Sequence, residues 1–245
     1  MSGAALGKLI GVGTGPGDPD LLTVKAVKAI RNADVLAWFA KEGKRGNGRG
    51  IVEGLVRDTT IELPLYYPVT TEIHRAKPEY VDQVTAFYEQ SAADIAEHLL
   101  AGRNVAVLSE GDPLFYGSYM HLHVRLANRF PTEVIPGVTA MSGCWSQAQL
   151  PIVQGDDVLS VLPGTMEEHQ LVRRLRDTEA AVIMKVGRNL PKIRRALAEA
   201  GRINDAFYVE RGTMANTSMT PLASKSDDEA PYFSIVLVPG WKTKP

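Results

Sequence analysis

Short apolar runs alternate with stretches in which apolar residues recur every three or four positions. The run at residues 8–12 is typical of a buried strand, and it leads through closely spaced glycines to Asp18 and Pro19. An aspartate followed by proline favours a helix start, because the carboxylate caps free N–H groups and proline suits the first helical position. We therefore predict a helix from there to Asn32 and a second strand opening at Asp34.

The same arrangement recurs further along the chain. Strands are predicted at residues 59–63, 104–108 and 133–135, and a helix or helix pair at residues 78–100. The strands at 104–108 and 133–135 enter glycine-containing loops, as the first strand does. Because the carboxyl ends of parallel strands meet at one edge of a sheet, we expect these three loops to lie together and bind a ligand.

The second half of the chain has a different pattern of apolar residues. Two helical stretches, 171–176 and 191–200, lie among several short strand-like runs. The runs cover residues 157–162, 181–186, 206–210, 220–224 and 233–238. We place a junction near residues 137–145 and predict two α/β domains, residues 1–138 and 139–245.

The first glycine loop does not match a phosphate-binding loop. Its spacing departs from G-x-G-x-x-G, and no G-x-x-x-x-G-K-[ST] is present. Pro16 has no N–H to offer a phosphate, and Asp18 would repel one at the helix start. The loop therefore suits close approach to a ligand without phosphate binding, while a tight turn without a ligand and an NAD(P)-dependent oxidoreductase remain alternatives.

Composition and charge reduce the number of protein classes to which the chain can belong. The 245 residues are 44% hydrophobic and 22% charged, as in ordinary soluble proteins, and the net charge of −1 argues against nucleic-acid binding as the main task. The single cysteine, Cys144, excludes an intramolecular disulfide and provides no metal cluster. No apolar run of about 18 residues and no signal peptide is recognisable. We expect a cytoplasmic protein with no metal, nucleic-acid or membrane partner.

Six motifs taken together resemble the tetrapyrrole methylase family, which uses S-adenosylmethionine. They are GVGTGPGDPDLLTVKAVKAIRNADV, SEGDPLFYG, VIPGVTA, AVIMKVGRN, VERGTMANT and PYFSIVLVPG. The resemblance covers almost the whole chain. It implies two α/β domains, the first with a mostly parallel sheet and the second with a mixed one, with the methyl donor in a cleft between them and usually a homodimer.

Two longer stretches are most similar to family members that methylate precorrin-2. PLYYPVTTEIHRAKPEY and SEGDPLFYGSYMHLHVRL, with the total length, imply methylation at carbon 20 to give precorrin-3A in cobalamin biosynthesis. The nearest alternative substrate is the cobalt-containing cobalt-factor II, followed by another tetrapyrrole. A non-catalytic protein that senses the donor or a tetrapyrrole is a further alternative.

The resemblance also implies which residues lie beside the methyl donor, whose product is S-adenosylhomocysteine. They are Pro16, Glu110, Gly111, Asp112, Phe115, Thr139, Ala140, Met184 and Gly212. For Asp112 the alternative is a helix cap alone, and for Met184 it is ordinary core packing.

Proton removal after methyl transfer requires a base, and a substrate with many carboxylates requires cations. The unranked candidates for the base are Glu110, Tyr116, His121 and His123. The candidate anchors are Arg45, Arg49, His74, Arg75 and Arg125, each with a solvated charge as the alternative. We expect residues 41–50, rich in glycine and basic residues, to form a mobile loop.

Overall fold

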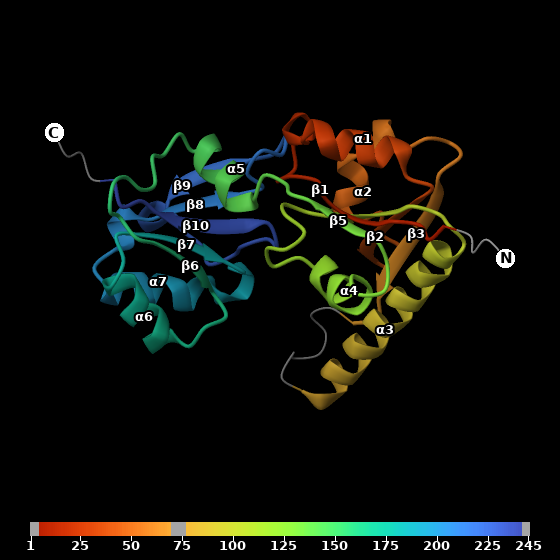
Figure 1. Ribbon diagram of the computed structural model, residues 1–245. Helices are drawn as coiled ribbons and strands as arrows, with labels where there is room; N and C mark the ends of the chain where they lie inside the picture. The colour runs from red at the N-terminus through yellow and green to blue at the C-terminus, as the bar shows by residue number, and fades with distance from the viewer. Residues whose placement is uncertain (1–4, 70–76, 242–245) are drawn as a thin grey trace. The chain divides into compact units, whose positions relative to one another are not determined.

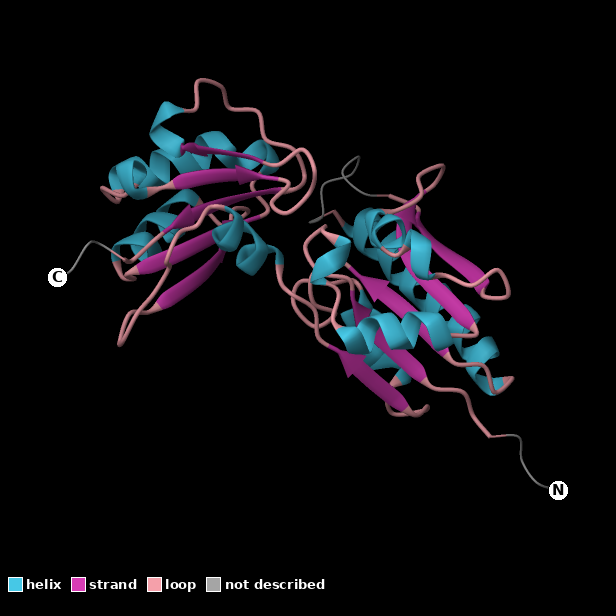
Figure 2. Cartoon of the chain, turned by 90° about the horizontal axis from the view of Figure 1, so that it is seen from above, coloured by secondary structure: helices cyan, strands magenta, loops and turns pink. Residues whose placement is uncertain are grey.

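A five-stranded sheet with helices on both faces lies at the centre of each half of the chain (Figures 1 and 2). The computed structural model describes residues 5–69 and 77–241. The chain divides into two units, Met1–Thr139 and Ala140–Pro245, which we refer to as unit 1 and unit 2. Each unit is described by itself below.

The unit 1 sheet is entirely parallel, with the strand order β3-β2-β4-β1-β5. Its strands are β1 (Leu9–Gly13), β2 (Val35–Lys41), β3 (Ile61–Tyr67), β4 (Val105–Ser109) and β5 (Thr132–Ile135). Strands covered on both faces read as continuous apolar runs, which explains why the sequence reveals them. The edge strand β3 contains Pro64, whose missing N–H is tolerated where only one side of a strand is paired.

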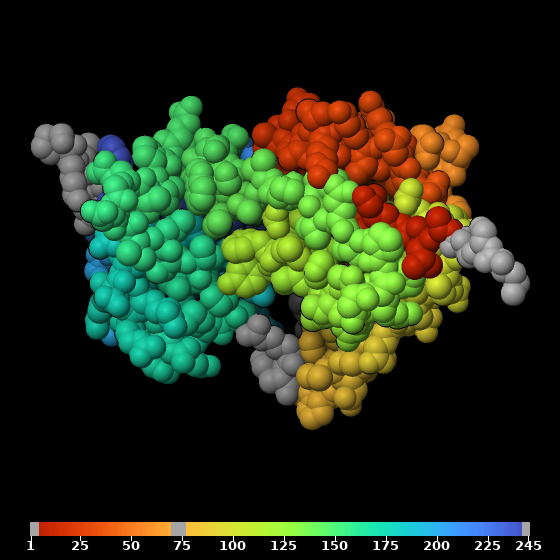
Figure 3. All heavy atoms as spheres, viewed as in Figure 1, coloured from red at the N-terminus to blue at the C-terminus, as the bar shows by residue number. Residues whose placement is uncertain are grey.

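Helices cover both faces of this sheet because each connection between parallel strands must cross over it. α1 (Val24–Asn32) and α2 (Asn47–Ile51) lie on one face, and α3 (Pro78–Leu100) and α4 (Tyr119–Leu126) lie on the other (Figure 1). The region 78–100 is thus one helix rather than a helix pair. Its outer side lies at the surface of unit 1 (Figure 3).

The first helix begins later than Asp18, where the sequence places its start. Asp18 caps only the 3-10 turn Pro19–Leu21, through a hydrogen bond from the Asp20 N–H. Thr23 caps α1 itself, because its Oγ1 accepts a hydrogen bond from the Ala26 N–H at 3.0 Å. Two capped elements follow each other here, and the aspartate–proline pair marks the start of the first one, the 3-10 turn.

Residues 41–50 are not entirely the loop that their composition predicts. The segment turns at Gly46, which has φ of +78°, and enters α2. A Cβ at Gly46 would lie 2.9 Å from the Phe39 carbonyl oxygen, so both the turn and the close packing require glycine. Composition favours a loop because three glycines in six residues weaken a helix, and contacts outside the helix outweigh this preference.

The unit 2 sheet is mixed, with the order β6-β7-β10-β8-β9. Its strands are β6 (Leu159–Pro163), β7 (Ala180–Met184), β8 (Phe207–Glu210), β9 (Ser218–Pro221) and β10 (Ser234–Val238). Only β6 and β7 pair in parallel. The parallel and mixed sheets confirm the fold class that the family resemblance implies, although the strand expected at 220–224 lies two residues earlier and ends at Pro221.

Unit 2 also buries helices on both faces of its sheet. α5 (Ala140–Gln147) packs on one face, and α6 (Glu168–Arg176) and α7 (Leu190–Glu199) pack on the other. Leu171, Ile193 and Leu197 are fully buried against the sheet. Each such side chain contributes about 1.5–3 kcal/mol, so the amphipathic pattern of α6 and α7 accounts for their position.

Candidate functional site

Three loops leave the carboxyl edge of the unit 1 sheet next to one another. Strands β4, β1 and β5 are neighbours, and residues 110–118, 14–18 and 136–139 follow them. The chain continues from β1 to α1 on one face and from β4 to α4 on the other. In open parallel sheets, ligands bind where neighbouring connections leave in opposite directions.

Glycines allow these loops to touch through their backbones. The Gly111 N–H donates to the Gly15 carbonyl at 2.8 Å, and the Gly15 N–H donates to the Gly111 carbonyl at 3.3 Å. A Cβ at Gly137 would lie 2.0 Å from the Gly111 oxygen, and one at Gly13 would lie 2.5 Å from the Gly137 nitrogen. We refer to Gly13, Gly15, Gly111 and Gly137 as the glycine junction.

Asp112 ties two of the loops together. One carboxylate oxygen accepts a hydrogen bond from the Leu114 N–H at 2.9 Å, and the other accepts one from the Gly137 N–H at 3.1 Å. The carboxylate therefore does more than cap its own turn, since it also bonds the loop after β5. Its contact with a methyl donor stays a prediction.

The tip of the loop after β4 presents apolar groups to solvent. Leu114 and Tyr116 are 48% and 45% exposed, and the Phe115 and Tyr116 rings meet edge to face with centroids 4.9 Å apart. Tyr116 has φ of +54°, which is uncommon for a bulky residue and tends to occur at functional sites. Pro16 lies half-buried in the neighbouring loop.

Glu110 is the predicted site carboxylate that receives hydrogen bonds from α2. The Asn47 side chain and the Gly48 backbone N–H bond to it. Part of the residue is solvent-exposed, but desolvation by the surrounding protein raises the pKa of the Glu110 carboxyl, against the lowering effect of these two bonds. A carboxylate in this position suits a positively charged ligand.

The two histidines of α4 have different surroundings. The His121 ring stacks on the Tyr88 ring with centroids 4.0 Å apart, and the residue is solvent-exposed. Partial burial, followed by the nearby Arg125 charge, lowers the pKa of His121, so the neutral form that accepts protons is favoured. Arg125 itself donates to the His121 carbonyl at 2.9 Å.

His123 is instead part of the packing of α4 on β1. Its Nδ1 lies 3.2 Å from the hydroxyl of Tyr119, which is fully buried. Burial raises the pKa of Tyr119 to about 12, so the phenol stays neutral. A Cβ at Gly11 would lie 2.4 Å from the Tyr119 ring, which shows how closely helix and strand approach.

An aromatic cluster near the same edge of the sheet escapes sequence analysis. Phe39 and Tyr67 stack with ring centroids 5.7 Å apart, and both contact Phe87 of α3. The Tyr67 hydroxyl also hydrogen bonds to Ser118, directly before α4. Three elements, β2, β3 and α3, supply these rings, so no spacing in the sequence indicates the cluster.

The predicted cationic anchors are separated by the structure. Arg49 is only 7% exposed and pairs with Glu62, whereas Arg45 pairs with Glu53 at the surface at 2.7 Å. His74 and Arg75 lie outside the described residues. Anchoring of the substrate by any of these cations stays a prediction.

In unit 2, the predicted residues Ala140, Met184 and Gly212 lie around one small core. Ala140 and Met184 pack against a cluster that includes Cys144. A Cβ at Gly212 would lie 2.5 Å from the Cys144 sulfur. Burial raises the pKa of Cys144 to about 11, so its thiol is a packing group rather than a nucleophile.

The carboxyl ends of strands β7 and β8 in unit 2 are followed by residues with unusual backbone conformations. Lys185, Arg211 and Thr213, which follow β7 and β8, have φ of +56°, +47° and +71°. Positive φ is rare for a β-branched residue such as Thr213, and such strain is often associated with ligand sites. Thr139, the remaining predicted residue, ends unit 1.

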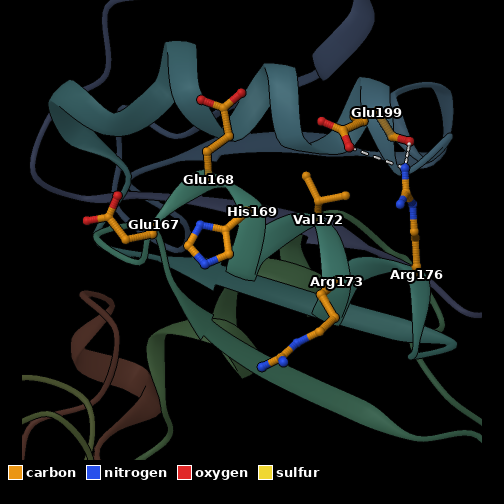
Figure 4. A pocket seen from close by; sticks show the side chains of 7 residues that line it. All are labelled: Glu167, Glu168, His169, Val172, Arg173, Arg176 and Glu199. Carbon is orange, nitrogen blue, oxygen red and sulfur yellow. Dashed lines mark hydrogen bonds and ion pairs between the residues drawn. The ribbon is translucent and has the colours of Figure 1, made fainter.

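A separate hollow of about 670 Å³ lies between α6 and α7 (Figure 4). Charged side chains line it, and Arg176 bonds to Glu199 across it. None of the predicted site residues lines this hollow. Its wide opening and paired charges are typical of a solvated groove between helices.

Neither a membrane segment nor a metal site is found in the described part of the chain. None of the helices in residues 5–69 and 77–241 combines the length and apolar character that crossing a bilayer requires. The same residues contain no group of three or more His, Cys, Asp or Glu side chains placed to hold a metal ion.

Comparison with known sequences identifies relatives over the whole chain. The model of the family described as Tetrapyrrole (Corrin/Porphyrin) Methylases matches residues 8–224. Precorrin-2 C(20)-methyltransferase of a Sinorhizobium species is 74% identical over 245 residues, 100% of both chains. Cobalamin biosynthesis protein CobIJ of Mycobacterium tuberculosis is 47% identical over 98% of this chain, which spans 47% of that protein. Cobalt-precorrin-2 C(20)-methyltransferase of Salmonella typhimurium is 28% identical over 95% of this chain and 96% of that one.

Solved structures share the fold at low identity. A cobalt precorrin-4 methyltransferase, CbiF, matches with a TM-score of 0.72 and 19% identity over 95% of this chain and 94% of that one. A uroporphyrin-III C-methyl transferase from Thermus thermophilus, complexed with S-adenyl homocysteine, matches with a TM-score of 0.63 and 22% identity over 94% and 97%.

Proposed function

The chain belongs to the tetrapyrrole (corrin/porphyrin) methylases, and from this premise we propose that it transfers a methyl group from S-adenosylmethionine to carbon 20 of precorrin-2. Membership of this family makes the chain a methyltransferase, and our proposal concerns its substrate. The observation that carries the proposal is the 74% identity over the full length to a precorrin-2 C(20)-methyltransferase. The product would be precorrin-3A, in cobalamin biosynthesis.

The carboxyl edge of unit 1 has features that suit the methyl donor. This donor carries a positive sulfonium and an ammonium, so it needs acceptors and apolar walls rather than a phosphate-binding loop. The glycine junction brings the backbones of the three loops together, Glu110 supplies a carboxylate, and Phe115 supplies an apolar surface. The family match also argues against the oxidoreductase alternative that the glycine loop left open.

The chemistry is a displacement in which the bond from sulfur to methyl breaks as the bond from carbon 20 to methyl forms. The bound donor supplies the activated methyl group. The contribution that we assign to the protein is alignment, because fixing two reactants in the correct geometry can lower a barrier by about 7–11 kcal/mol in the best cases. Rigid loops such as the glycine junction are suited to this role.

The proton that leaves carbon 20 after transfer needs an acceptor. Among the four candidates, we favour His121 over His123, because His121 is exposed and its pKa is lowered, whereas His123 bonds to the buried Tyr119. Glu110 and Tyr116 stay as alternatives near the glycine junction. Replacing each histidine by glutamine and comparing the pH dependence of kcat separates them.

Incubation with S-adenosylmethionine and precorrin-2 tests the proposal. We expect a product heavier by one methyl group in place of one hydrogen, detected by mass spectrometry, with a known C-20 methyltransferase as the positive control. Binding of both ligands without turnover would instead indicate a sensing protein. The 28% identical Salmonella relative is named as a cobalt-precorrin-2 C(20)-methyltransferase. If the chain prefers a cobalt-containing substrate, the substrate assignment changes.

We also propose that the chain forms a homodimer, as the family resemblance implies, and that it is located in the cytoplasm, as its single cysteine favours. Size-exclusion chromatography with light scattering measures the mass of the assembly. A mass of one chain across the accessible concentrations would contradict the dimer.

A further inference from the structure

The five-residue helix α2 connects the interior of unit 1 to the carboxyl edge of its sheet. Asn47 and Gly48, in its first turn, both hydrogen bond to Glu110. A Cβ at Gly48 would lie 3.6 Å from Leu108 Cβ and 3.8 Å from Thr14 Oγ1, so α2 lies directly against the ends of β4 and β1. The orientation of the Glu110 carboxylate therefore depends on where α2 is held.

A helix of five residues is not stable alone, so contacts with the sheet must fix it. Arg49 provides some of these contacts from inside the protein, where it is 7% exposed. Its Nη2 and Nε lie 2.5 Å and 3.3 Å from the two carboxylate oxygens of Glu62 on β3. Its guanidinium carbon lies 5.7 Å from the ring centroid of Trp38 on β2. Two-pronged pairing and stacking are contacts that arginine makes and lysine does not reproduce.

We propose that Arg49 is a positioning residue, which anchors α2 so that the helix holds the Glu110 carboxylate in the orientation that binds the methyl donor. This inference rests on the proposed function, because it takes the donor as the ligand of Glu110. It assigns to Arg49 a role that differs from anchoring substrate carboxylates. A buried guanidinium that is paired with Glu62 acts through the helix rather than by touching a ligand.

Charged groups on the elements around Glu110 have partners of their own. Arg49 of α2 faces Glu62, and the Asp112 carboxylate accepts hydrogen bonds from two backbone N–H groups. Asp18, after β1, accepts one from the turn that it caps. We therefore expect the pH midpoint of cation binding at this edge to change when the hydrogen bonds that α2 donates to Glu110 are lost.

Calorimetric titration with S-adenosylhomocysteine from acidic to neutral pH tests the proposal on the full chain. We expect Arg49→Met to weaken binding about tenfold, a change of about 1.4 kcal/mol. It should also move the pH midpoint of binding upward, because the hydrogen bonds from α2 lower the pKa of Glu110. Asn47→Ala should move the midpoint in the same direction, and the double variant should add little to either single change.

Arg57→Met is the matched control. Arg57 donates to the Ala33 carbonyl at 3.0 Å, and these two residues precede β3 and β2, away from the carboxyl edge that carries Glu110. Loss of Arg57 should therefore lower stability without moving the midpoint. If Arg49→Met and Asn47→Ala keep the wild-type affinity and midpoint, the inference is overturned while the proposed function stands. If the wild-type chain does not bind S-adenosylhomocysteine, both fail.

Arg49→Met is a large change in a buried position and can prevent folding. Arg49→Lys then replaces it, because lysine keeps the charge but loses the two-pronged pairing. A partial upward shift of the midpoint, in the direction of the Asn47→Ala shift, supports the inference. An Arg49→Lys midpoint equal to that of the wild type overturns it.

Discussion

Glycines allow close contacts in both units, but a Cβ added to them would meet different kinds of atom. In unit 1, a Cβ at Gly137 or Gly13 would meet the backbone of another loop. In unit 2, a Cβ at Gly212 would first meet the side chain of Cys144. A side chain can be shortened by mutation or can rotate, whereas backbone moves only if the loops separate. The close approach of the loops in unit 1 therefore requires glycine at these positions whatever the neighbouring side chains are, and the unit 2 contact depends on a pair of residues.

The largest effect is expected for Gly137→Ala. The new Cβ would lie 2.0 Å from the Gly111 carbonyl oxygen, and no rotamer relieves that contact. We expect a loss of about 3 kcal/mol or more of unfolding free energy, the upper range for overpacking, measured by urea denaturation. Gly54→Ala is the control, because nothing lies within 4 Å of a Cβ there, and its change should stay within about 0.5 kcal/mol.

Asp112→Asn should have the next largest effect. The amide keeps one acceptor, so one of the N–H groups of Leu114 and Gly137 loses its partner. An unpaired backbone donor of this kind costs about 1–3 kcal/mol, again measured by urea denaturation. A stability equal to that of the wild type would show that Asp112 does not hold the loops together.

Gly212→Ala tests the unit 2 side of the comparison. We expect a loss of about 1–3 kcal/mol from the contact with the Cys144 sulfur. Adding Cys144→Ala should recover about 1 kcal/mol of it, because the nearest remaining atom, the Cys144 Cα, would lie 3.1 Å away. If the double variant is no more stable than the sum of the single changes predicts, the Gly212 contact is limited by backbone atoms, as the contacts of the glycine junction are.

The smallest effect is expected for Glu110→Gln, and its sign depends on pH. The pKa of Glu110 is raised in the folded chain, so folding favours the protonated carboxyl. That contribution is fully present below the ordinary glutamate pKa and is lost as the pH rises through the folded value. The stability of the variant relative to the wild type should therefore increase from acidic to neutral pH, as followed by Tm. A difference that stays constant with pH would contradict the raised pKa.

The elements that sequence analysis predicts well are those that carry their own local signal. β1 and β4 are continuous apolar runs, and each enters a glycine loop. The spacing of the first of these loops already argues against phosphate binding. The close approach of Gly13 and Gly137 could not be foreseen, because it depends on the order of the strands in the sheet. Asp112 likewise bonds a residue 25 positions away.

Arg49 and α2 show why the rest is not predictable from local patterns. A segment rich in glycine and arginine has the composition of a solvated loop, and nothing near it in the sequence indicates Glu62 or Trp38 as partners. The pairing arises because β2 and β3 are neighbours, in a register that places Trp38 beside Pro64. Burial of a charge is thus a property of the assembled sheet.

The proline in β3 has a consequence for how copies of this chain can associate. β3 is an edge strand, and an edge normally offers a row of free N–H and C=O groups to a strand from another molecule. Pro64 removes a donor from the middle of that row, so an incoming strand could not form a continuous ladder along it. In this way Pro64 interrupts sheet extension and cross-β growth at this edge of unit 1.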